Sequence, residues 1–185
     1  MRKKCFLIIV AVTLFRVMLF GNEYWEEIYS AEEILGDVVL NSSKDIFLGT
    51  QSGVYKSFDD GVSWDQKLDI NTHNLVIDSN GVLFATRWNI YYSQNNGEDW
   101  SQIEYPNLMS FSARLFFTIS GDMLYYSNGI FKTSNHGETW TKVLDCGVDG
   151  ECIYEIVETS QGVLFAGSTD FLAIGIPGGV YRSTD

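Results

Sequence analysis

Residues 44–64 read KDIFLGTQSGVYKSFDDGVSW, and this stretch decides the fold because its pattern recurs along the chain. Similar stretches lie at residues 80–100 (NGVLFATRWNIYYSQNNGEDW), 121–140 (GDMLYYSNGIFKTSNHGETW) and 161–185 (QGVLFAGSTDFLAIGIPGGVYRSTD). Each begins with a turn, continues through a short apolar strand, a loop and a second strand, and enters a polar turn. Such self-similarity is typical of repeat architectures, so it takes precedence over any local interpretation.

A polar turn with a fixed spacing ends each repeat. Its pattern is (Ser/Thr)-x-(Asp/Asn)-x-Gly-x-x-Trp, and the tryptophans of successive copies lie 36 and 40 residues apart. That period suits one four-stranded blade of a β-propeller, about 40–50 residues. Three complete copies and a fourth that breaks off supply these motif residues: Ser57, Asp59, Gly61 and Trp64; Ser93, Asn95, Gly97 and Trp100; Thr133, Asn135, Gly137 and Trp140; Ser183 and Asp185.

Each residue type in the motif has a role in folding. The Asp or Asn side chain accepts hydrogen bonds from backbone N–H groups about two residues further on. Gly adopts the positive φ that a tight hairpin needs, and the Ser or Thr hydroxyl bonds back across the loop. We expect the Trp to open the returning strand and to supply apolar surface. The motif therefore predicts a structural hairpin clamp, and we assign no catalytic, cofactor-binding or metal-binding residue.

The repeats predict an all-β fold, a β-propeller of four-stranded antiparallel blades. Apolar strands that precede the repeats are expected to be innermost, at 37–40, 75–78, 115–119 and 153–157, and outermost strands are expected at 63–68, 99–103 and 139–144. The expected blades span residues 35–68, 73–104, 113–145 and 152–185. Because the fourth motif is cut off, we expect about three and a half to four blades of an incomplete ring, as in a fragment of a longer propeller.

Residues 1–21 (MRKKCFLIIVAVTLFRVMLFG) combine a basic start with an apolar run and precede the body, residues 22–185. This layout is typical of a secretory signal peptide. Arg16 interrupts the apolar run and no small-residue cleavage site follows, so an uncleaved membrane anchor is the alternative. Either interpretation predicts a secreted, periplasmic or cell-surface protein whose only membrane contact is this N-terminal segment.

Outside the leader the chain is strongly acidic. The formal net charge is −12, and residues 1–21 hold four of the 12 bases and none of the 24 acids. Such a body repels polyanions, so we expect it to bind neither nucleic acid nor anionic membrane surfaces. With 45% apolar and 15% aromatic residues, the composition is globular rather than disordered.

Cys146 and Cys152 flank a short loop, DCGVDGEC, between the third and fourth expected blades. Cys5 lies in the leader, so cleavage leaves an even pair of cysteines in the body. In an oxidising compartment we expect the pair to form a disulfide that pins the loop. Two free thiols are the alternative.

At the motif residues the sequence resembles the Asp-box, or BNR-repeat, β-propeller superfamily. This superfamily includes sialidases, sortilin-type receptor ectodomains and photosystem II assembly-factor-like propellers. The resemblance covers about residues 37–185 and is carried by segments such as GVYKSFDDGVSW (53–64) and GGVYRSTD (178–185). In this superfamily the Asp-box is a structural turn at the blade periphery, so the resemblance implies a fold and leaves the activity open.

A sialidase-like glycoside hydrolase is one alternative function. That activity needs an arginine cluster, a nucleophilic Tyr with a Glu partner, and an acidic Asp. The body has only Arg87, Arg114 and Arg182, so most catalytic residues of a hydrolase would have to follow residue 185. A periplasmic sensor propeller of a two-component regulator is a further alternative, because residues 73–86 (HNLVIDSNGVLFAT) resemble the repeats of that group.

Two loops gather acidic side chains, and neither has the spacing of a calcium-binding loop. The members are Asp59, Asp60 and Asp65 in one loop, and Asp145, Asp149 and Glu151 in the other. His73 and His136 lie in different repeats without the spacing of zinc ligands. We expect solvated loop residues at these positions, with no metal and no cofactor.

The favoured function is a non-catalytic binding or scaffold module for a protein or glycan ligand outside the cytoplasm. The apolar insertion at residues 169–177 (TDFLAIGIP) lengthens the fourth repeat. Exposed loops on a rigid scaffold are frequent binding sites, so partner binding at this loop is a hypothesis. An ordinary hairpin extension that folds onto its own blade is the alternative.

Overall fold

The computed structural model describes residues 26–30, 35–103, 113–145, 153–168 and 178–184. The chain divides into two units, residues 1–30 and residues 31–185. In the first unit, the described residues 26–30 have no regular secondary structure. The second unit contains all of the strands.

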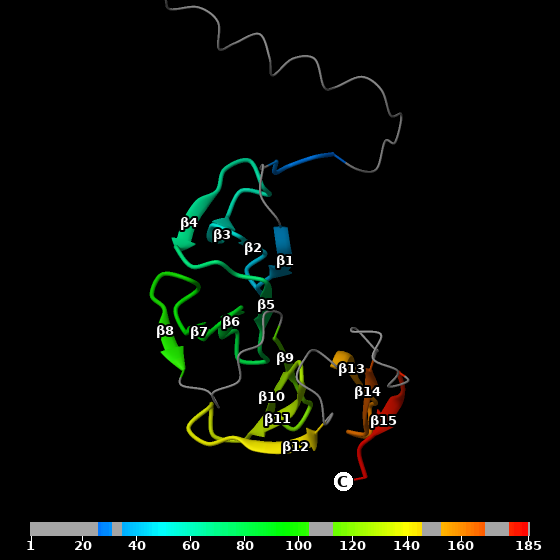
Figure 1. Ribbon diagram of the computed structural model, residues 1–185. Coiled ribbons are helices and arrows are strands. Elements are labelled where there is room, and N and C mark those ends of the chain that lie inside the picture. The colour runs from blue at the N-terminus through cyan, green and yellow to red at the C-terminus, as the bar shows by residue number, and fades with distance from the viewer. Residues whose placement is uncertain (1–25, 31–34, 104–112, 146–152, 169–177, 185) are drawn as a thin grey trace, which may run out of the picture. The chain divides into compact units, whose positions relative to one another are not determined.

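Fifteen strands form four antiparallel sheets in the described residues, and no helix is found among them (Figure 1). Each sheet is a simple meander in chain order, and each is one blade. The first blade contains β1 (Leu35–Leu40), β2 (Ile46–Thr50), β3 (Gly53–Ser57) and β4 (Asp65–Leu68). The second contains β5 (Asn74–Ile77), β6 (Leu83–Thr86), β7 (Ile90–Ser93) and β8 (Ser101–Ile103). The third contains β9 (Arg114–Phe117), β10 (Met123–Tyr126), β11 (Gly129–Thr133) and β12 (Thr141–Asp145), and the fourth contains β13 (Ile153–Glu158), β14 (Leu164–Ser168) and β15 (Val180–Arg182).

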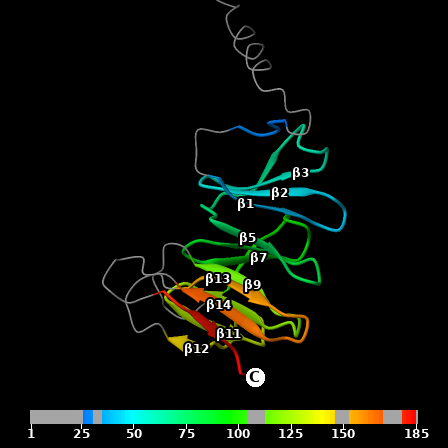
Figure 2. The same cartoon turned by 90° about the vertical axis from the view of Figure 1, so that its right-hand side faces the viewer.

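The arrangement of these sheets is that of a β-propeller, which confirms the fold class that the repeats predicted. The first strands of successive blades are neighbours, because β5 contacts both β1 and β9. Figure 2 shows the same order, with β1, β5 and β9 following one another through the molecule. The innermost strands therefore come from the apolar segments that precede each repeat.

The hydrophobic core lies between neighbouring blades. Phe47 and Val54 of the first blade pack with Leu75 and Leu83 of the second. Similar clusters lie between the second and third blades, and between the third and fourth. In β6, Leu83 belongs to the cluster with the first blade and Phe84 to the cluster with the third, because successive side chains of a strand point to opposite faces. Strands covered on both faces are apolar throughout, as in the fully buried segments LFAT and MLYY of β6 and β10.

The motif tryptophans close the polar turns instead of opening the outermost strands. The strands β4, β8 and β12 begin one residue after Trp64, Trp100 and Trp140, whereas the sequence had suggested a start one residue before each. The Trp64 indole N–H donates to the carbonyl oxygen of Gly61 at 3.1 Å, which ties the ring to the turn. The ladder of backbone hydrogen bonds therefore starts only beyond the tryptophan.

Candidate functional site

The polar turns share one hydrogen-bond pattern in the first three blades. In the first, Ser57 Oγ donates to Asp59 Oδ1 at 2.9 Å and accepts from the backbone N–H of Gly61 at 2.8 Å. The N–H of Ser63 donates to Asp59 Oδ1 at 2.9 Å, so the carboxylate reaches four residues on and not two. The same bonds join Ser93, Asn95, Gly97 and Asp99 in the second blade, and Thr133, Asn135, Gly137 and Thr139 in the third.

Two successive residues with positive φ make each of these turns tight. Asp60 has φ 57° and Gly61 has φ 87°, and the N–H of Val62 donates to the carbonyl of Asp59 at 3.3 Å. This is the geometry of a type I′ turn, whose twist matches that of the flanking strands. The residue before Gly is Asn96 in the second blade and His136 in the third, two types that tolerate this region better than most.

Asp59 differs from its counterparts because it can carry a charge. Its two oxygens accept from the N–H and the hydroxyl of Ser63, the latter at 2.7 Å. Hydrogen bonds from Ser63, and a weaker one from Ser57, favour the carboxylate and lower the pKa of Asp59. Asn95 and Asn135 fill the same position without a titratable group.

The third tryptophan lacks the bond that its counterparts make. The Trp100 indole N–H donates to the carbonyl of Gly97 at 3.0 Å, as Trp64 does to Gly61. The N–H of Trp140 is buried and has no partner among the described residues. Trp140 instead packs edge-on against Tyr125, with ring centroids 6.2 Å apart.

Each motif glycine of the second and third blades lies against the blade before it. A Cβ at Gly97 would lie 2.9 Å from Cε1 of Phe47 in the first blade. A Cβ at Gly137 would overlap Cγ2 of Ile103 in the second blade. The glycines therefore meet two requirements at once, a positive φ and a close approach between blades.

A polar network closes the junction between the first and second blades beside Gly97. Asn96 of the second blade bonds with Asn41 at 2.6 Å and donates to Asp45 at 2.7 Å. Lys56 lies 3.3 Å from Asp45 and 3.7 Å from Glu98, and Lys67 lies 2.9 Å from Glu98. The hydrogen bond from Asn96 is the main cause that lowers the pKa of Asp45, and the bond from Lys67 lowers the pKa of Glu98.

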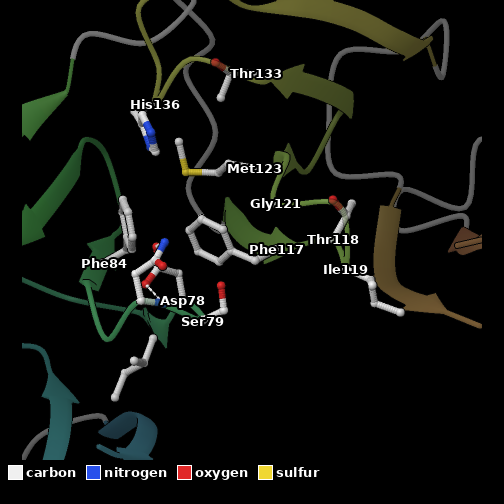
Figure 3. Close-up of a pocket in the computed structure, with 12 residues that line it drawn as sticks. Asp78, Ser79, Phe84, Phe117, Thr118, Ile119, Gly121, Met123, Thr133 and His136 are labelled. Atoms are coloured by element: carbon white, nitrogen blue, oxygen red, sulfur yellow. Dashed lines mark hydrogen bonds between the residues drawn. The ribbon is translucent and has the colours of Figure 1, made fainter. Parts of the chain in front are cut away.

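The corresponding junction between the second and third blades is open. Two adjoining cavities of about 240 Å³ and 740 Å³ share Asp78, Asn80, Phe84 and His136, and together we call them the blade 2–3 groove. Figure 3 shows Asp78, Phe84 and His136 bordering the smaller cavity. The larger cavity is lined further by Tyr92, Gln94, Gln102, Asn135 and Glu138.

The lining of the groove combines aromatic faces, amides and acids. Phe84 and Tyr92 stack with centroids 6.3 Å apart and provide an apolar base. The exposed side chains of Gln94, Gln102 and Glu138 surround it. This chemistry suits the recognition of a polar ligand that also has an apolar part.

Sequence reasoning missed a hydrogen-bond chain across the innermost strands. Asn74 is 5% exposed and links three blades. Its Nδ2 donates to Asp37 Oδ2 at 2.7 Å, and its Oδ1 accepts from the N–H of Leu115 at 2.9 Å. A polar residue at the start of an otherwise apolar strand was the only available signal.

The turns between the first two strands of each blade repeat as well. A side-chain oxygen accepts from the N–H four residues on, at 2.8 to 3.1 Å. The four acceptors are Asn41, Asp78, Thr118 and Thr159. Their chemical variety hides this repeat in the sequence.

The three arginines of the body have separate surroundings. Arg87 bonds with Asn71, and Arg182 lies over the ring of Phe165 with its guanidinium carbon 6.0 Å from the centroid. Arg114 lies 6.0 Å from the ring centroid of Tyr154. Their partners differ, and we do not assign them as the arginine cluster that a sialidase uses for its substrate carboxylate.

Arg114 nevertheless has a tyrosine and a glutamate nearby. Tyr126 is 4% exposed, and burial together with the charge of Glu155 raises the pKa of its phenol, with Arg114 acting in the opposite direction. A nucleophilic tyrosine must be reachable and easily deprotonated. Tyr126 is neither, so this trio does not supply a glycosidase nucleophile.

Within the described residues, no group of three or more His, Cys, Asp or Glu side chains has the geometry of a metal site. Asp59 is bonded within its turn, and Asp145 pairs with Lys142 at 2.7 Å. His73 precedes β5 and His136 lies in the third motif turn. The described part of the chain also includes no helix with the length and hydrophobicity of a membrane span.

Several predicted features lie outside the described residues. They are Cys146 and Cys152, Asp149 and Glu151, the insertion at 169–177, and Asp185 of the fourth motif. Ser183 is described, and its hydroxyl accepts from the N–H of Leu164 at 2.9 Å.

No family model matches the sequence, and a comparison with the curated proteins finds no match. Solved structures do match. An ancestral GH74 enzyme has a TM-score of 0.65 at 18% identity over 80% of this chain and 24% of its own. The extracellular domain of a protein described as a one-component system from B. thetaiotaomicron gives 0.62 at 19% identity over 82% and 20%. YCF48 bound to D1 peptide gives 0.59 at 17% identity over 83% and 53%.

These likenesses show the β-propeller fold alone, because sequence identity is low throughout. This chain spans between 20% and 53% of the length of the three matched chains. The class of protein is therefore a β-propeller, and its activity has to be argued from its own residues.

Proposed function

We propose that this chain is a non-catalytic β-propeller module that works outside the cytoplasm and binds a protein or glycan ligand. The observation that carries the proposal is the blade 2–3 groove, about 740 Å³ in its larger part, with aromatic, amide and carboxylate groups in its lining. Concave sites with a few polar groups around an apolar base are the usual sites of ligand binding. The same position at the preceding junction is closed by the protein's own side chains.

The groove has a composition that suits binding. Its acids are Asp78 and Glu138, and its other titratable side chains are His136 and Tyr92. Oδ1 of Asp78 already accepts from the N–H groups of Asn80 and Val82, so that oxygen is used in its own turn. Acid–base catalysis needs two groups positioned around one reacting bond, and we assign no such pair among the groove residues.

We assign the polar turns a structural role, as Asp-boxes. In the first turn, Ser57, Asp59 and Trp64 direct their polar atoms at the turn itself. A group that is fully used in a local turn has no free capacity for a ligand. The disulfide between Cys146 and Cys152 stays a prediction.

One structural likeness supports a site outside the cytoplasm, and another supports binding. One matched chain is an extracellular domain, and another, YCF48, is described with a bound peptide. Together with the leader at residues 1–21, they favour a surface or secreted binding module over a cytoplasmic enzyme.

A binding screen with a turnover assay tests the proposal. The full chain, labelled with a fluorophore, is incubated with a glycan panel and with an arrayed library of peptides. We expect saturable binding to members of one class and no release of reducing sugar from any glycan. Reducing ends that accumulate in proportion to protein concentration would show a hydrolase instead.

A further inference from the structure

The junction between the first and second blades shows how this fold holds an ammonium group. Nζ of Lys56 lies 5.6 Å from the ring centroid of Phe47 and 3.3 Å from a carboxylate oxygen of Asp45. Its other neighbours are Glu98 at 3.7 Å and the backbone carbonyl of Asn96 at 3.4 Å. An aromatic face, carboxylates and a carbonyl together form a seat for a cation.

The next junction keeps part of this seat and lacks the lysine. Phe47 pairs with Lys56 across β2 and β3, and Phe84 pairs with Tyr92 at the equivalent place in β6 and β7. By the same alignment, Glu138 corresponds to Glu98 and His136 to Asn96. Tyrosine therefore stands where the first blade has its lysine, and Val82 stands where it has Asp45. Of the neighbours of the lysine, the aromatic ring and one carboxylate, that of Glu138, remain.

The charges of the two junctions differ accordingly. At the first, Asp45 and Glu98 are balanced by two lysines, Lys56 and Lys67. In the blade 2–3 groove the acids are Glu138 and Asp78, which aligns with Asn41, and among the described residues no Lys or Arg forms a salt bridge with either. A groove with unbalanced carboxylates favours a ligand that brings the missing positive charge.

We propose that the blade 2–3 groove binds a lysine side chain from an extended segment of a partner protein, with the ammonium between the half-buried ring of Tyr92, which stacks on Phe84, and the carboxylate of Glu138. The inference rests on the proposed function and specifies its ligand. The larger cavity of about 740 Å³ also has room for residues that flank the lysine, and Gln94 and Gln102 offer amides to their backbone.

Backbone amide shifts of the full chain, recorded by NMR, provide the test. The probes are N-acetyl-lysine methylamide and N-acetyl-norleucine methylamide, which differ only in the terminal group. We expect the lysine probe to shift amides of residues 78–82 and 134–138, and the norleucine probe to leave them unchanged. Because the seat is partly open to solvent, raising the salt concentration should weaken the effect.

Two variants locate the site. Glu138→Gln removes the carboxylate and should weaken binding of the lysine probe about fivefold or more. Tyr92→Lys places an internal lysine in the seat, as Lys56 does in the first blade, and should abolish binding. Asp65→Asn, an exposed site in the first blade, removes one charge elsewhere and should leave binding unchanged.

The outcomes separate this inference from the proposed function. Equal shifts with norleucine, or a lysine response that survives both variants, would overturn the lysine seat. If a ligand from the glycan or peptide screen binds equally well to the parent chain and both variants, the proposed function stands and the groove is not its site. If neither the screen nor the lysine probe detects binding, both proposals are wrong.

Discussion

Gly137 shows what the packing of neighbouring blades requires of a single residue. Its φ is 92°, and a Cβ would overlap Cγ2 of Ile103. Gly121 has a φ of 89° and nothing within 4 Å of a built Cβ. Both glycines therefore have similar backbone requirements, and only one has a steric requirement.

We expect Gly137→Ala to lower the free energy of unfolding more than Gly121→Ala does. Positive φ alone costs a non-glycine residue about 1–3 kcal/mol, and overpacking adds about 1–3 kcal/mol for Gly137→Ala. Urea unfolding of the two variants measures the difference. Equal losses of unfolding free energy would mean that Ile103 moves away from an added Cβ at position 137 without a cost.

A comparison of the tryptophans of the second and third motifs isolates the contribution of one hydrogen bond to the free energy of unfolding. Trp→Phe removes the indole N–H and some volume in both places. Trp100 loses its bond to Gly97, whereas Trp140 loses only an unsatisfied buried donor. We therefore expect Trp100→Phe to cost about 1 kcal/mol more in unfolding free energy than Trp140→Phe. The same chemical denaturation series measures this, and a larger cost at Trp140 would contradict it.

Asp59 should make stability sensitive to acid. Because its pKa is lowered in the folded state, its contribution is complete above the ordinary carboxyl pKa, near 4, and is lost as the pH falls through the folded value. Asp59→Asn keeps the acceptor, and its amide can donate to Ser63 as Asn135 donates to Thr139 at 2.9 Å.

We expect Asp59→Asn to melt close to the parent chain at pH 7 and to lose less stability than the parent between pH 4 and pH 2.5. Melting temperatures followed by circular dichroism across this range provide the measurement. Parallel curves would show that the Asp59 carboxylate does not contribute to the acid sensitivity.

At the scale of the element, the innermost strands depend on one amide. Asn74→Leu keeps a similar volume and leaves the N–H of Leu115 without its partner and the Asp37 carboxylate without the amide donor. We expect a loss of about 2 kcal/mol or more in unfolding free energy. In a double-mutant cycle with Asp37→Leu, the two losses should add to more than the loss of the double variant. Strict additivity would mean that the bond contributes nothing.

The positions of the strands were predictable because their residues follow the repeat. Periodicity placed β2, β6 and β10 within a residue or two, since each is an apolar run between turn residues. The start of β4 was missed because the fate of Trp64 depends on its bond to Gly61, which the pattern does not reveal. Asn74 was missed because its partners lie in neighbouring blades, far away in the sequence.

At the scale of the whole molecule, the location of the chain can be measured. We expect the full chain, fused at its C-terminus to bacterial alkaline phosphatase, to show phosphatase activity in a bacterial host, because that enzyme needs disulfides that form only outside the cytoplasm. Deletion of residues 1–21 should abolish the activity. Equal activity with and without the leader would contradict an export role for this segment.

The groove was beyond the reach of the sequence pattern. Its existence depends on the difference between Lys56 in one repeat and Tyr92 in the next, and the repeat pattern does not constrain the residue type at this position. The difference between Lys56 and Tyr92 predicts a groove only when the motif turn of one blade is known to face the first turn of the preceding blade, as Asn96 faces Asp45. The pattern singled out the turns but not what lies between them.

The contact of Gly97 with Phe47, and of Gly137 with Ile103, also bears on how such a chain can be recombined. A blade that is exchanged as a whole carries a polar turn that fits the preceding blade of its original chain, and this preceding blade is absent from the new chain. A segment that runs from the second strand of one blade to the polar turn of the next keeps both halves of a contact together. In shuffling experiments, and in the gene duplications that lengthen repeat proteins, the unit that keeps its packing intact is then the junction between two blades and not the single blade.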